Sequence, residues 1–304
     1  MTAPQVEARP VLLERRRRGL DAALRAMSGE LLRLCMEADA PLREGLMRLV
    51  SAGGKRLRPS LAYWCWRMAG EAERDVLPLM LMLELMHTAS LIHDDIVDGA
   101  GTRRGCPALH TLVGERAAVQ GADYLLARAM ERLGAYRGRG VNECLTAVSI
   151  EMCRGELWQR EALRGRAEQT EESYFVQIRR KTAGLIEAAC RCGVLAASRD
   201  GAMAERLAAF GLNLGMAFQL RDDLLDFTGE GLPLKPAGLD GRGGIRTLPA
   251  LRMAAGASRA EAVRETEGMI RARTAEAVAA LDSFDCPEAG ALRALAGQMA
   301  KRCC

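Results

Sequence analysis

The amino-acid sequence predicts an all-α protein, and three observations support this fold class. Ala, Leu, Met, Arg and Glu dominate the composition, and all of them are good helix formers. Several apolar-rich segments exceed the usual length of a strand, namely 76–92, 143–157, 174–197 and 203–227. No segment shows a convincing strand-like alternation of apolar and polar residues.

Helix breaks are expected where glycine, proline and polar residues cluster, at 99–107, 137–140, 229–244 and 285–287. A further helical run is expected at 259–281. We interpret 229–244 as a mobile lid, because a loop rich in Gly and Pro beside an acidic segment can close over a bound ligand.

The chain is expected to form one domain, residues 1–304, with 1–20 as an N-terminal segment that can be mobile. Its 304 residues can bury one large core. This length also fits two domains, but the polar motifs described below are spread along the chain and must converge in one site.

Composition argues against several classes of function. The net charge of +4 is too small to indicate nucleic-acid binding, and the basic run 15–18 is interpreted as a solvated helix end rather than a membrane or partner patch. The ten cysteines are scattered and the three histidines are too few for a convincing zinc set, so reduced thiols are expected. Apolar runs are too short for an integral membrane segment and the start lacks a secretory segment, which favours a cytoplasmic protein.

An acidic motif occurs twice, as DDIVD at 94–98 and as DDLLD at 222–226. On a helix, the first and last aspartates of each motif project from the same face. Each motif follows apolar residues, which places these carboxylates near a core or cleft, where unpaired charge is costly. A solvated helix face would explain one such motif, but two copies in similar settings favour clamps that hold a diphosphate through Mg2+.

Basic residues in three further segments can supply donors for the remaining phosphate oxygens. GGKRLRP at 53–59 offers Lys55 and Arg58, 103–105 offers a pair of arginines, and Lys181 precedes Thr182. Arg binds phosphate in a bidentate manner whereas Lys acts as a point charge, so the mixture suits two diphosphates with different neighbours. Chance placement is the alternative, but it would not produce this order along the chain.

Taken in order, these motifs resemble those of the trans-isoprenyl diphosphate synthases, also called polyprenyl synthetases. The matching segments are GGKRLRP at 53–59, HDDIVD at 93–98, RRGCP at 103–107, GELWQ at 155–159, KTAGL at 181–185 and FQLRDDLLD at 218–226. The resemblance implies a single-domain isoprenoid-synthase-type helical bundle around a central cleft, which usually forms a homodimer. It also implies a magnesium-dependent, head-to-tail addition of allylic diphosphates to isopentenyl diphosphate.

The resemblance assigns roles to individual residues as well. It implies that isopentenyl diphosphate is bound by Lys55, Arg58, His87 and Arg104. For the allylic diphosphate, it implies Mg2+ on Asp94, Asp98 and Asp222, contacts from Arg103, Lys181, Gln219 and Lys235, and Thr182 beside the reacting carbons. The expected catalytic residues are Asp94, Asp95, Asp98, Arg103, Lys181, Thr182, Gln219, Asp222 and Asp223.

Elementary chemistry supports this division of roles. Ionisation of an allylic diphosphate produces an anion, which needs metal and basic residues, and a carbocation, which must be kept from water. Binding aligns the isopentenyl double bond with the cation, and a proton is finally lost to the departing diphosphate. No protein nucleophile or organic cofactor is needed.

Two features depart from the family pattern. The usual Gly-Lys-x-Thr-Leu-Pro reads GIRTLP at 244–249, so Ile245 replaces the customary lysine and Arg246 is the nearest substitute charge. The region after residue 249 is shorter than is usual in the family, which is expected to affect stability or subunit contacts more than chemistry. Glu156 and Gln159 fit either hydrogen bonds into the site or a surface pair.

Product length is expected to depend on residues just before the first acidic motif. Ala89 and Ser90 are small and lie about 6–8 Å from Asp94 at the helical rise per residue, with Met86 another turn deeper. A long-chain product, such as the precursor of a quinone side chain, is therefore favoured. The alternative is a farnesyl or geranylgeranyl diphosphate synthase.

Two other classes of protein stay open. A terpene cyclase would share the helices and one acidic motif, but it would not need Lys55, Arg58 and Arg104. A catalytically silent subunit of a heteromeric synthase is consistent with Ile245 and the short C-terminal region, although no acidic residue of the motifs is lost.

Overall fold

The computed structural model describes residues 9–70, 75–138, 140–198, 200–229 and 244–301, and this part of the chain is almost entirely helical. The all-α prediction is therefore confirmed. The helices are α1 (Arg9–Met36), α2 (Leu42–Ser51), α3 (Leu57–Met68), α4 (Leu77–Val97), α5 (Leu109–Val113), α6 (Glu115–Met130), the 3-10 helix η1 (Glu131–Tyr136), α7 (Val141–Leu163), α8 (Glu171–Ile178), the π-helix η2 (Arg179–Ala183), α9 (Gly184–Ala197), α10 (Gly201–Thr228), α12 (Leu248–Ala254), α13 (Arg259–Ala279) and α14 (Pro287–Lys301).

The structure departs from the sequence predictions in two places. The segment 174–197 is not one regular helix, because the π-helix η2 interrupts it between α8 and α9. The expected break at 99–107 contains a minimal hairpin of β1 (Thr102–Arg103) and β2 (Cys106–Pro107). Its turn residues, Arg104 and Gly105, both have positive φ, at 53° and 76°. Positive φ at both positions matches the twist of a tight hairpin.

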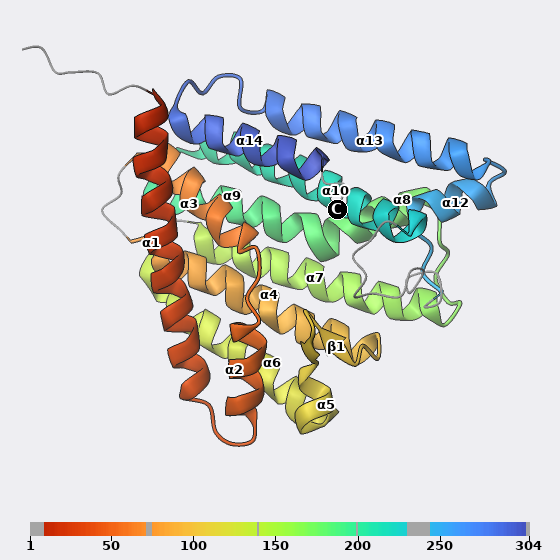
Figure 1. Cartoon of the computed structure of the whole chain (residues 1–304), viewed down its shortest axis with the longest axis horizontal. Helices are drawn as coiled ribbons and strands as arrows, with labels where there is room; N and C mark the ends of the chain where they lie inside the picture. Colours follow the sequence, from red (N-terminus) through yellow and green to blue (C-terminus); the bar gives the residue numbers. More distant parts are fainter. Residues whose placement is uncertain (1–8, 71–74, 139, 199, 230–243, 302–304) are drawn as a thin grey trace, which may run out of the picture.

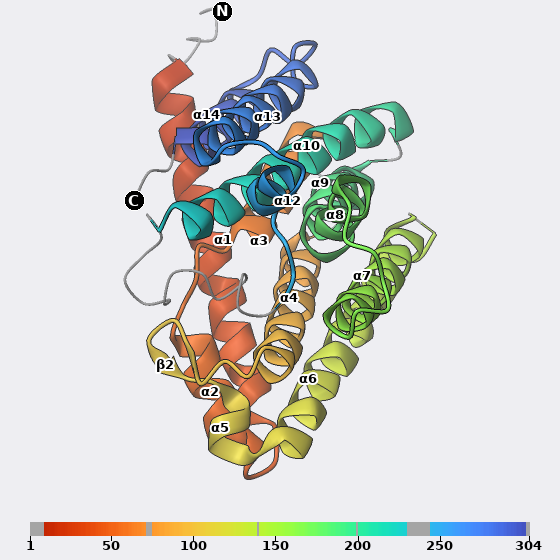
Figure 2. The ribbon, with the colours of Figure 1, turned by 90° about the vertical axis from the view of Figure 1, so that its right-hand side faces the viewer.

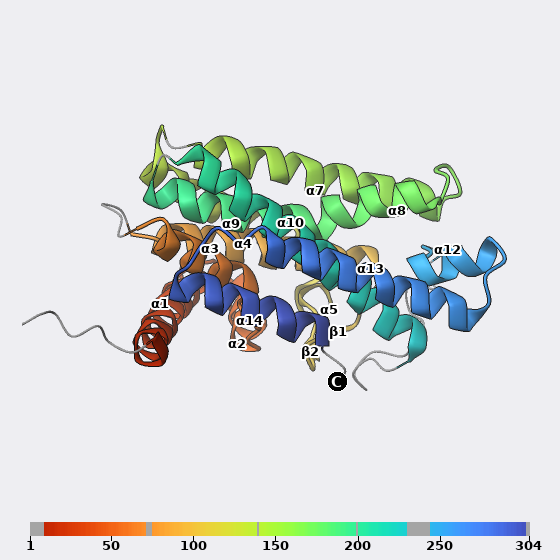
Figure 3. The same cartoon turned by 90° about the horizontal axis from the view of Figure 1, so that it is seen from above.

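The central helices place the two acidic motifs at the same end of the molecule. α9 and α10 lie side by side, with α7 next to α9 and α13 next to α10 (Figures 1 and 3). α1 crosses the ends of these helices that lie opposite the acidic motifs. α4 and α10 both run from left to right in Figure 1, and the motifs lie near their C-terminal ends. Figure 2 shows the molecule from that end.

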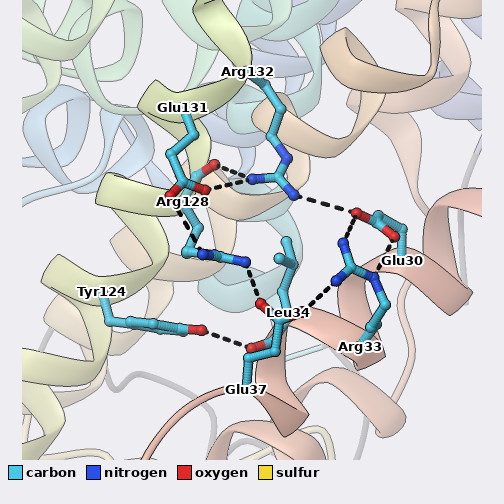
Figure 4. Close-up of polar contacts among 8 residues, drawn as sticks. All are labelled: Glu30, Arg33, Leu34, Glu37, Tyr124, Arg128, Glu131 and Arg132. Atoms are coloured by element: carbon cyan, nitrogen blue, oxygen red, sulfur yellow. Dashed lines mark hydrogen bonds and ion pairs between the residues drawn. The ribbon is translucent and has the colours of Figure 1, made fainter.

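A polar network fixes α1 against α6 (Figure 4). Arg128 of α6 and Arg132 of η1 form ion pairs with glutamates of α1. The hydroxyl group of Tyr124 donates a hydrogen bond to the carbonyl oxygen of Leu34 at 2.8 Å. Exposed ion pairs contribute little singly, so we attribute the register of these helices mainly to packing and to the Tyr124 bond.

The apolar core consists of one large cluster spread over most helices and a smaller cluster between α8, α10, α12 and α13. None of the helices in the described part of the chain combines the length and the apolarity that a membrane span requires. Two predictions stay untested: that residues 1–304 form one domain, and that the region after residue 249 is shorter than is usual in the family. Residues 1–8 and most of the expected lid, 230–243, lie outside the described residues.

Two glycines allow the central helices to approach closely. A β-carbon on Gly193 of α9 would lie 2.5 Å from the carbonyl oxygen of Ala62 on α3. A β-carbon on Gly215 of α10 would lie 2.6 Å from the Cα atom of Ala183 in η2. Both distances are too short for any side chain, so η2 packs its backbone directly on α10.

We expect Gly215→Ala to lower the free energy of unfolding by about 1–3 kcal/mol, because the added methyl group overpacks the contact between α10 and η2. Gly29→Ala is the matched control, since Gly29 is exposed in α1 and an added β-carbon there meets nothing within 4 Å. The control should gain about 0.5–1 kcal/mol from higher helix propensity. Urea unfolding measures both, and a stabilised Gly215→Ala protein would contradict the close packing.

Candidate active site

The two acidic motifs contain two kinds of carboxylate. Asp94 is 24% exposed, and Asp98 and Asp222 are also accessible. Asp95 and Asp223 are buried, at 2% and 5% exposure. Adjacent helical positions point about 100° apart, which explains why neighbouring aspartates face solvent and core. The three predicted metal ligands are thus accessible, as is Asp226, whereas the middle aspartates contact other side chains.

The donor set fits a metal ion that binds together with a diphosphate. Within the described ranges, no three carboxylate, imidazole or thiol groups converge closely enough to hold a metal ion. Mg2+ usually takes one or two carboxylates together with waters and substrate phosphate oxygens. Accessible pairs of aspartates suit that mode of binding better than a closed protein cage.

Arg103 is fixed by the buried aspartate of the first motif. Its Nε atom donates to Oδ1 of Asp95 at 2.8 Å, and its Nη2 atom forms an ion pair with the same oxygen. This contact joins the hairpin to α4 and leaves Arg103 partly exposed. Asp95 is therefore a buried partner of Arg103 rather than an accessible carboxylate.

Lys181 lies at the centre of a set of polar side chains from α4, α7 and η2. Its Nζ atom is 2.7 Å from Oε1 of Glu156, 2.7 Å from Oε1 of Gln159 and 3.4 Å from Oδ1 of Asp94. Glu156 and Gln159 thus contact Lys181, which agrees with the first of their two alternatives, hydrogen bonds toward the predicted site. Burial opposes the charge on Lys181, but Asp94, Glu156 and Asp98 outweigh it and raise the pKa of Lys181.

Burial and the nearby Asp94 raise the pKa of Glu156 to about 7, although Lys181 works in the opposite direction. The site around Lys181 therefore contains more acidic groups than basic ones. Such an excess is relieved by any cation that arrives with the ligand.

The π-helix η2 explains why the neighbouring residues Lys181 and Thr182 contact different helices. A π-turn adds one residue to a helical turn and changes the direction of the side chains that follow, and such turns are frequent at functional sites. Lys181 contacts α7 and α4, while the Oγ1 atom of Thr182 donates to Oε1 of Gln219 on α10 at 2.8 Å. Gln219 in turn donates from Nε2 to Oδ1 of Asp223 at 2.8 Å.

A second group of side chains is mainly basic, and we call Arg56, Arg58, His87 and Arg104 the basic cluster. Arg56 forms an ion pair with Glu84, which is 3% exposed on α4. A β-carbon on Gly54 would lie 2.7 Å from Nη1 of Arg104, so the guanidinium group of Arg104 covers the glycine loop. The structure thus brings the predicted Arg58, His87 and Arg104 together, while Lys55 is exposed.

The pKa values of Arg58, His87 and Arg104 are all lowered, chiefly by burial. Burial lowers the pKa of Arg58 to about 10, although Glu84 opposes this. Burial, followed by the charges of Arg58 and Arg104, lowers the pKa of His87 well below its ordinary value. The Nε atom of Arg58 is buried and lacks a hydrogen-bond partner within the described residues. A buried donor without an acceptor, among like charges, indicates a site for an anion.

Backbone strain occurs in the same group of residues. Arg56 and Arg104 are the non-glycine residues of the described ranges with positive φ, at 47° and 53°. This conformation is costly for a residue with a side chain, and it tends to persist at functional sites. Both strained residues belong to the segments that surround His87.

Sequence reasoning missed three residues that the structure places in these groups. Arg56 was part of the motif at 53–59 but was not selected as a site residue. Glu84 lies three residues before His87, and a lone acid in the apolar run 76–92 was a signal that could have identified it. Tyr174 donates to Oδ2 of Asp223 at 2.5 Å, and the sequence held no signal for that contact.

The residues around Ile245 are held by Gln169. The side-chain amide of Gln169 donates from Nε2 to the carbonyl oxygen of Gly244 at 2.7 Å and accepts from the backbone nitrogen of Arg246 at 2.7 Å. Ile245, Arg246 and Asp226 line one cavity of about 620 Å3. Arg246 can therefore face the second motif in place of the customary lysine, whereas the predicted Lys235 lies outside the described residues.

The residues predicted to set product length lie on α4 beneath the first motif. Ala89 is 1% exposed and Met86 is 7% exposed, and both belong to the large apolar cluster. Ser90 is partly exposed, and its hydroxyl group donates to the carbonyl oxygen of His87 at 2.8 Å. The small residue at 89 thus lies where a larger side chain would have to displace its neighbours.

Comparison with known proteins gives consistent matches. A family model described as polyprenyl synthetase matches residues 39–283. The chain is 40% identical over 229 residues to heptaprenyl diphosphate synthase component 2 of Geobacillus stearothermophilus, which covers 75% of this chain and 71% of the relative. It is 34% identical over 224 residues to a short chain isoprenyl diphosphate synthase of Methanocaldococcus jannaschii, which covers 72% of this chain and 68% of the relative.

A solved structure resembles nearly the whole chain. It is a polyprenyl synthase from Caulobacter crescentus, complexed with calcium and isoprenyl diphosphate, and it superposes with a TM-score of 0.85. The two sequences are 32% identical, and the match covers 96% of this chain and 98% of that one.

Proposed function

Because the chain belongs to the polyprenyl synthetase family and is therefore a trans-prenyltransferase, we propose that it joins isopentenyl diphosphate to an allylic diphosphate, head to tail, with Mg2+. The observation that carries this proposal is the contrast between two neighbouring charged groups. One combines accessible aspartates with Lys181 and Arg103, and the other is the basic cluster. Two diphosphates, of which only one is held through metal, fit that contrast.

The proposed roles follow from this arrangement. Asp94, Asp98 and Asp222 would hold Mg2+, which would make the allylic diphosphate a better leaving group. Lys181 and Arg103 would bind the departing oxygens, and each is already oriented by a buried or half-buried acid. The basic cluster would bind isopentenyl diphosphate and align its double bond with the cation.

Incubation of the purified protein with Mg2+, labelled isopentenyl diphosphate and a series of allylic diphosphates tests this proposal. We expect label in an extractable prenyl product with at least one allylic primer, and no product when the metal is chelated. A protein that incorporates no label with any primer would support the catalytically silent subunit instead.

A long-chain product is the proposed outcome of the reaction. Ala89 is small and lies in the apolar cluster about one turn before the first motif, where a bulkier side chain would limit a growing chain. Relatives named heptaprenyl and solanesyl synthases are consistent with this, and relatives named short chain synthases keep the farnesyl or geranylgeranyl alternative open.

We expect Ala89→Tyr to shorten the product while the first condensation continues. The tyrosine would occupy space one turn below the first motif, so it would obstruct elongation but not the reacting carbons above it. Product sizing by reversed-phase chromatography measures this. Ala22→Tyr on the exposed face of α1 serves as the control for expression and folding. An unchanged product distribution from an active Ala89→Tyr enzyme would mean that residues elsewhere limit the length of the product.

A second copy of the chain is the proposed partner. Exposed apolar side chains occur on α6 and α7, which lie on one side of the molecule in Figure 2, and they include Val119, Met130, Ile150 and Leu157. Exposed apolar residues of this kind are typical of subunit contacts. One relative is named as a component of a heptaprenyl diphosphate synthase, so a heteromeric partner is the alternative. Light scattering of the purified chain distinguishes a homodimer from a monomer that needs another partner.

A further inference from the structure

A buried series of hydrogen bonds connects α8, α10 and η2. The hydroxyl group of Tyr174 donates to Oδ2 of Asp223 at 2.5 Å, and Nε2 of Gln219 donates to Oδ1 of the same carboxylate at 2.8 Å. Oγ1 of Thr182 then donates to Oε1 of Gln219 at 2.8 Å. Tyr174 and Asp223 are only 6% and 5% exposed, whereas Thr182 and Gln219 are partly exposed at the other end.

The direction of each hydrogen bond in this series follows from Asp223, at its buried end. Both oxygens of Asp223 accept hydrogen bonds, from Tyr174 and from Gln219, so Asp223 orients the NH2 group of Gln219 toward itself. The amide oxygen of Gln219 is then the part that faces Thr182. Thr182 has one hydroxyl hydrogen, and this bond uses it.

The direction of this bond decides which part of the Thr182 hydroxyl group faces a ligand. Because its hydrogen is directed to Gln219, the remaining exposed part of the oxygen is its lone pairs. Lone pairs held beside a developing carbocation stabilise it, whereas a hydroxyl hydrogen in the same place would destabilise it. If Asp223 shifted, the amide of Gln219 could rotate and reverse the direction of the Thr182 bond.

We propose that Tyr174 is a positioning residue for the condensation, which it serves by fixing Asp223 and, through Gln219, the orientation of the Thr182 hydroxyl. The inference rests on the proposed function, since it assumes an allylic carbocation beside Thr182. Tyr174 acts at a distance, through two intervening side chains, so it is not a catalytic residue in the sense of touching the reacting atoms.

The ring and the hydroxyl group of Tyr174 have separable roles. The ring packs edge-to-face against Phe175, with centroids 5.4 Å apart, and belongs to the cluster between α8, α10, α12 and α13. The hydroxyl group makes the bond to Asp223. Tyr174→Phe keeps the ring and removes the first donor of the series.

Tyr136→Phe is a matched control for the loss of a buried hydroxyl group. The Tyr136 side chain is fully buried, and its hydroxyl group donates to the carbonyl oxygen of Asp75 at 2.6 Å and accepts from the backbone nitrogen of Leu79 at 3.2 Å. These contacts lie at the start of α4, far along the helix from its acidic motif. Thermal unfolding of both variants establishes that each is folded.

We expect Tyr174→Phe to lower kcat by about 10- to 100-fold, the usual effect of losing an outer partner of a reactive group. KM for isopentenyl diphosphate should stay within about twofold, because the basic cluster is untouched. The affinity for an unreactive allylic thiolodiphosphate should also be unchanged, since the diphosphate contacts remain. Tyr136→Phe should keep kcat near the wild-type value.

A fluorinated allylic diphosphate provides a readout that a purely structural role would not change. Fluorine on the allylic carbons destabilises the cation, so the ratio of rates with the normal and the fluorinated substrate reports stabilisation of the cation. We expect this ratio to be larger for Tyr174→Phe than for wild type and for Tyr136→Phe. An equal ratio in all three proteins, or an equal kcat in both variants, would overturn the inference.

Asp223→Asn tests the series at its next member. Tyr174 and Gln219 donate to different oxygens of Asp223, and asparagine replaces one of these acceptors with an NH2 donor. We expect the losses of kcat in Tyr174→Phe and Asp223→Asn to be less than multiplicative in the double variant, because both act through Gln219. Multiplicative losses would contradict a shared route. Wild-type protein that turns over no allylic primer would instead refute the proposed function itself, before any variant is compared.

Discussion

Asp94→Asn and Asp222→Asn should each reduce kcat by about a thousandfold at saturating Mg2+, the order of loss caused by removing a preorganised charged group. Each substitution keeps the size of the side chain but removes the negative charge that would hold metal on the allylic diphosphate. The two residues lie on different helices, at the same end of the molecule. Steady-state kinetics across Mg2+ concentrations measures the effect.

The fold should survive both substitutions. Asp94 is 3.4 Å from Nζ of Lys181, but that amine keeps hydrogen bonds to Glu156 and Gln159 at 2.7 Å. Asp123→Asn, on an exposed position of α6, is the matched control for the loss of one surface charge, and its turnover should match that of wild type. Near-normal turnover of either Asp94→Asn or Asp222→Asn would mean that its motif is not a metal clamp.

The second large effect concerns the separation of the two diphosphates. Arg58→Leu should raise KM for isopentenyl diphosphate by about a hundredfold, because a buried charge-assisted contact to an anion is lost. Lys181→Met should instead impair the allylic substrate, since Lys181 lies beside Asp94 and not in the basic cluster. Initial rates with each substrate varied in turn distinguish the two effects.

The stability of these variants provides an independent check. Burial lowers the pKa of Arg58, so its charge is unfavourable in the empty protein, and Arg58→Leu should unfold at the same temperature as wild type or higher. Arg154→Leu, which removes a 61% exposed arginine of α7, is the control for a lost surface charge. A common rise in both KM values in Arg58→Leu and Lys181→Met would contradict two separate sites.

Helix positions and the motifs could be predicted from the sequence, because helix propensity, length and residue spacing are local properties. The predicted run 259–281 corresponds closely to α13, Arg259–Ala279. The π-helix η2 could not be predicted in this way. One extra residue in a turn leaves composition unchanged, and it is stabilised by the backbone contact of Gly215 with Ala183, which is distant in sequence.

The candidate site could be predicted as a set of residues but not as a set of contacts. The spacing within DDIVD and DDLLD does not show which aspartates are buried. In the structure Asp95 and Asp223 are buried and the other aspartates are accessible. The partners of the buried pair, Arg103 and Tyr174, come from other elements. Contacts between elements depend on packing, so a single sequence carries little information about them.

The central claim is that one chain joins two diphosphates, and the release of inorganic diphosphate tests it most directly. The purified chain is given Mg2+ and an allylic diphosphate, and release is measured as isopentenyl diphosphate is added. The account predicts no release without isopentenyl diphosphate and one diphosphate released for each isopentenyl unit incorporated. Release from the allylic substrate alone, as a cyclase or a hydrolase would give, would contradict it.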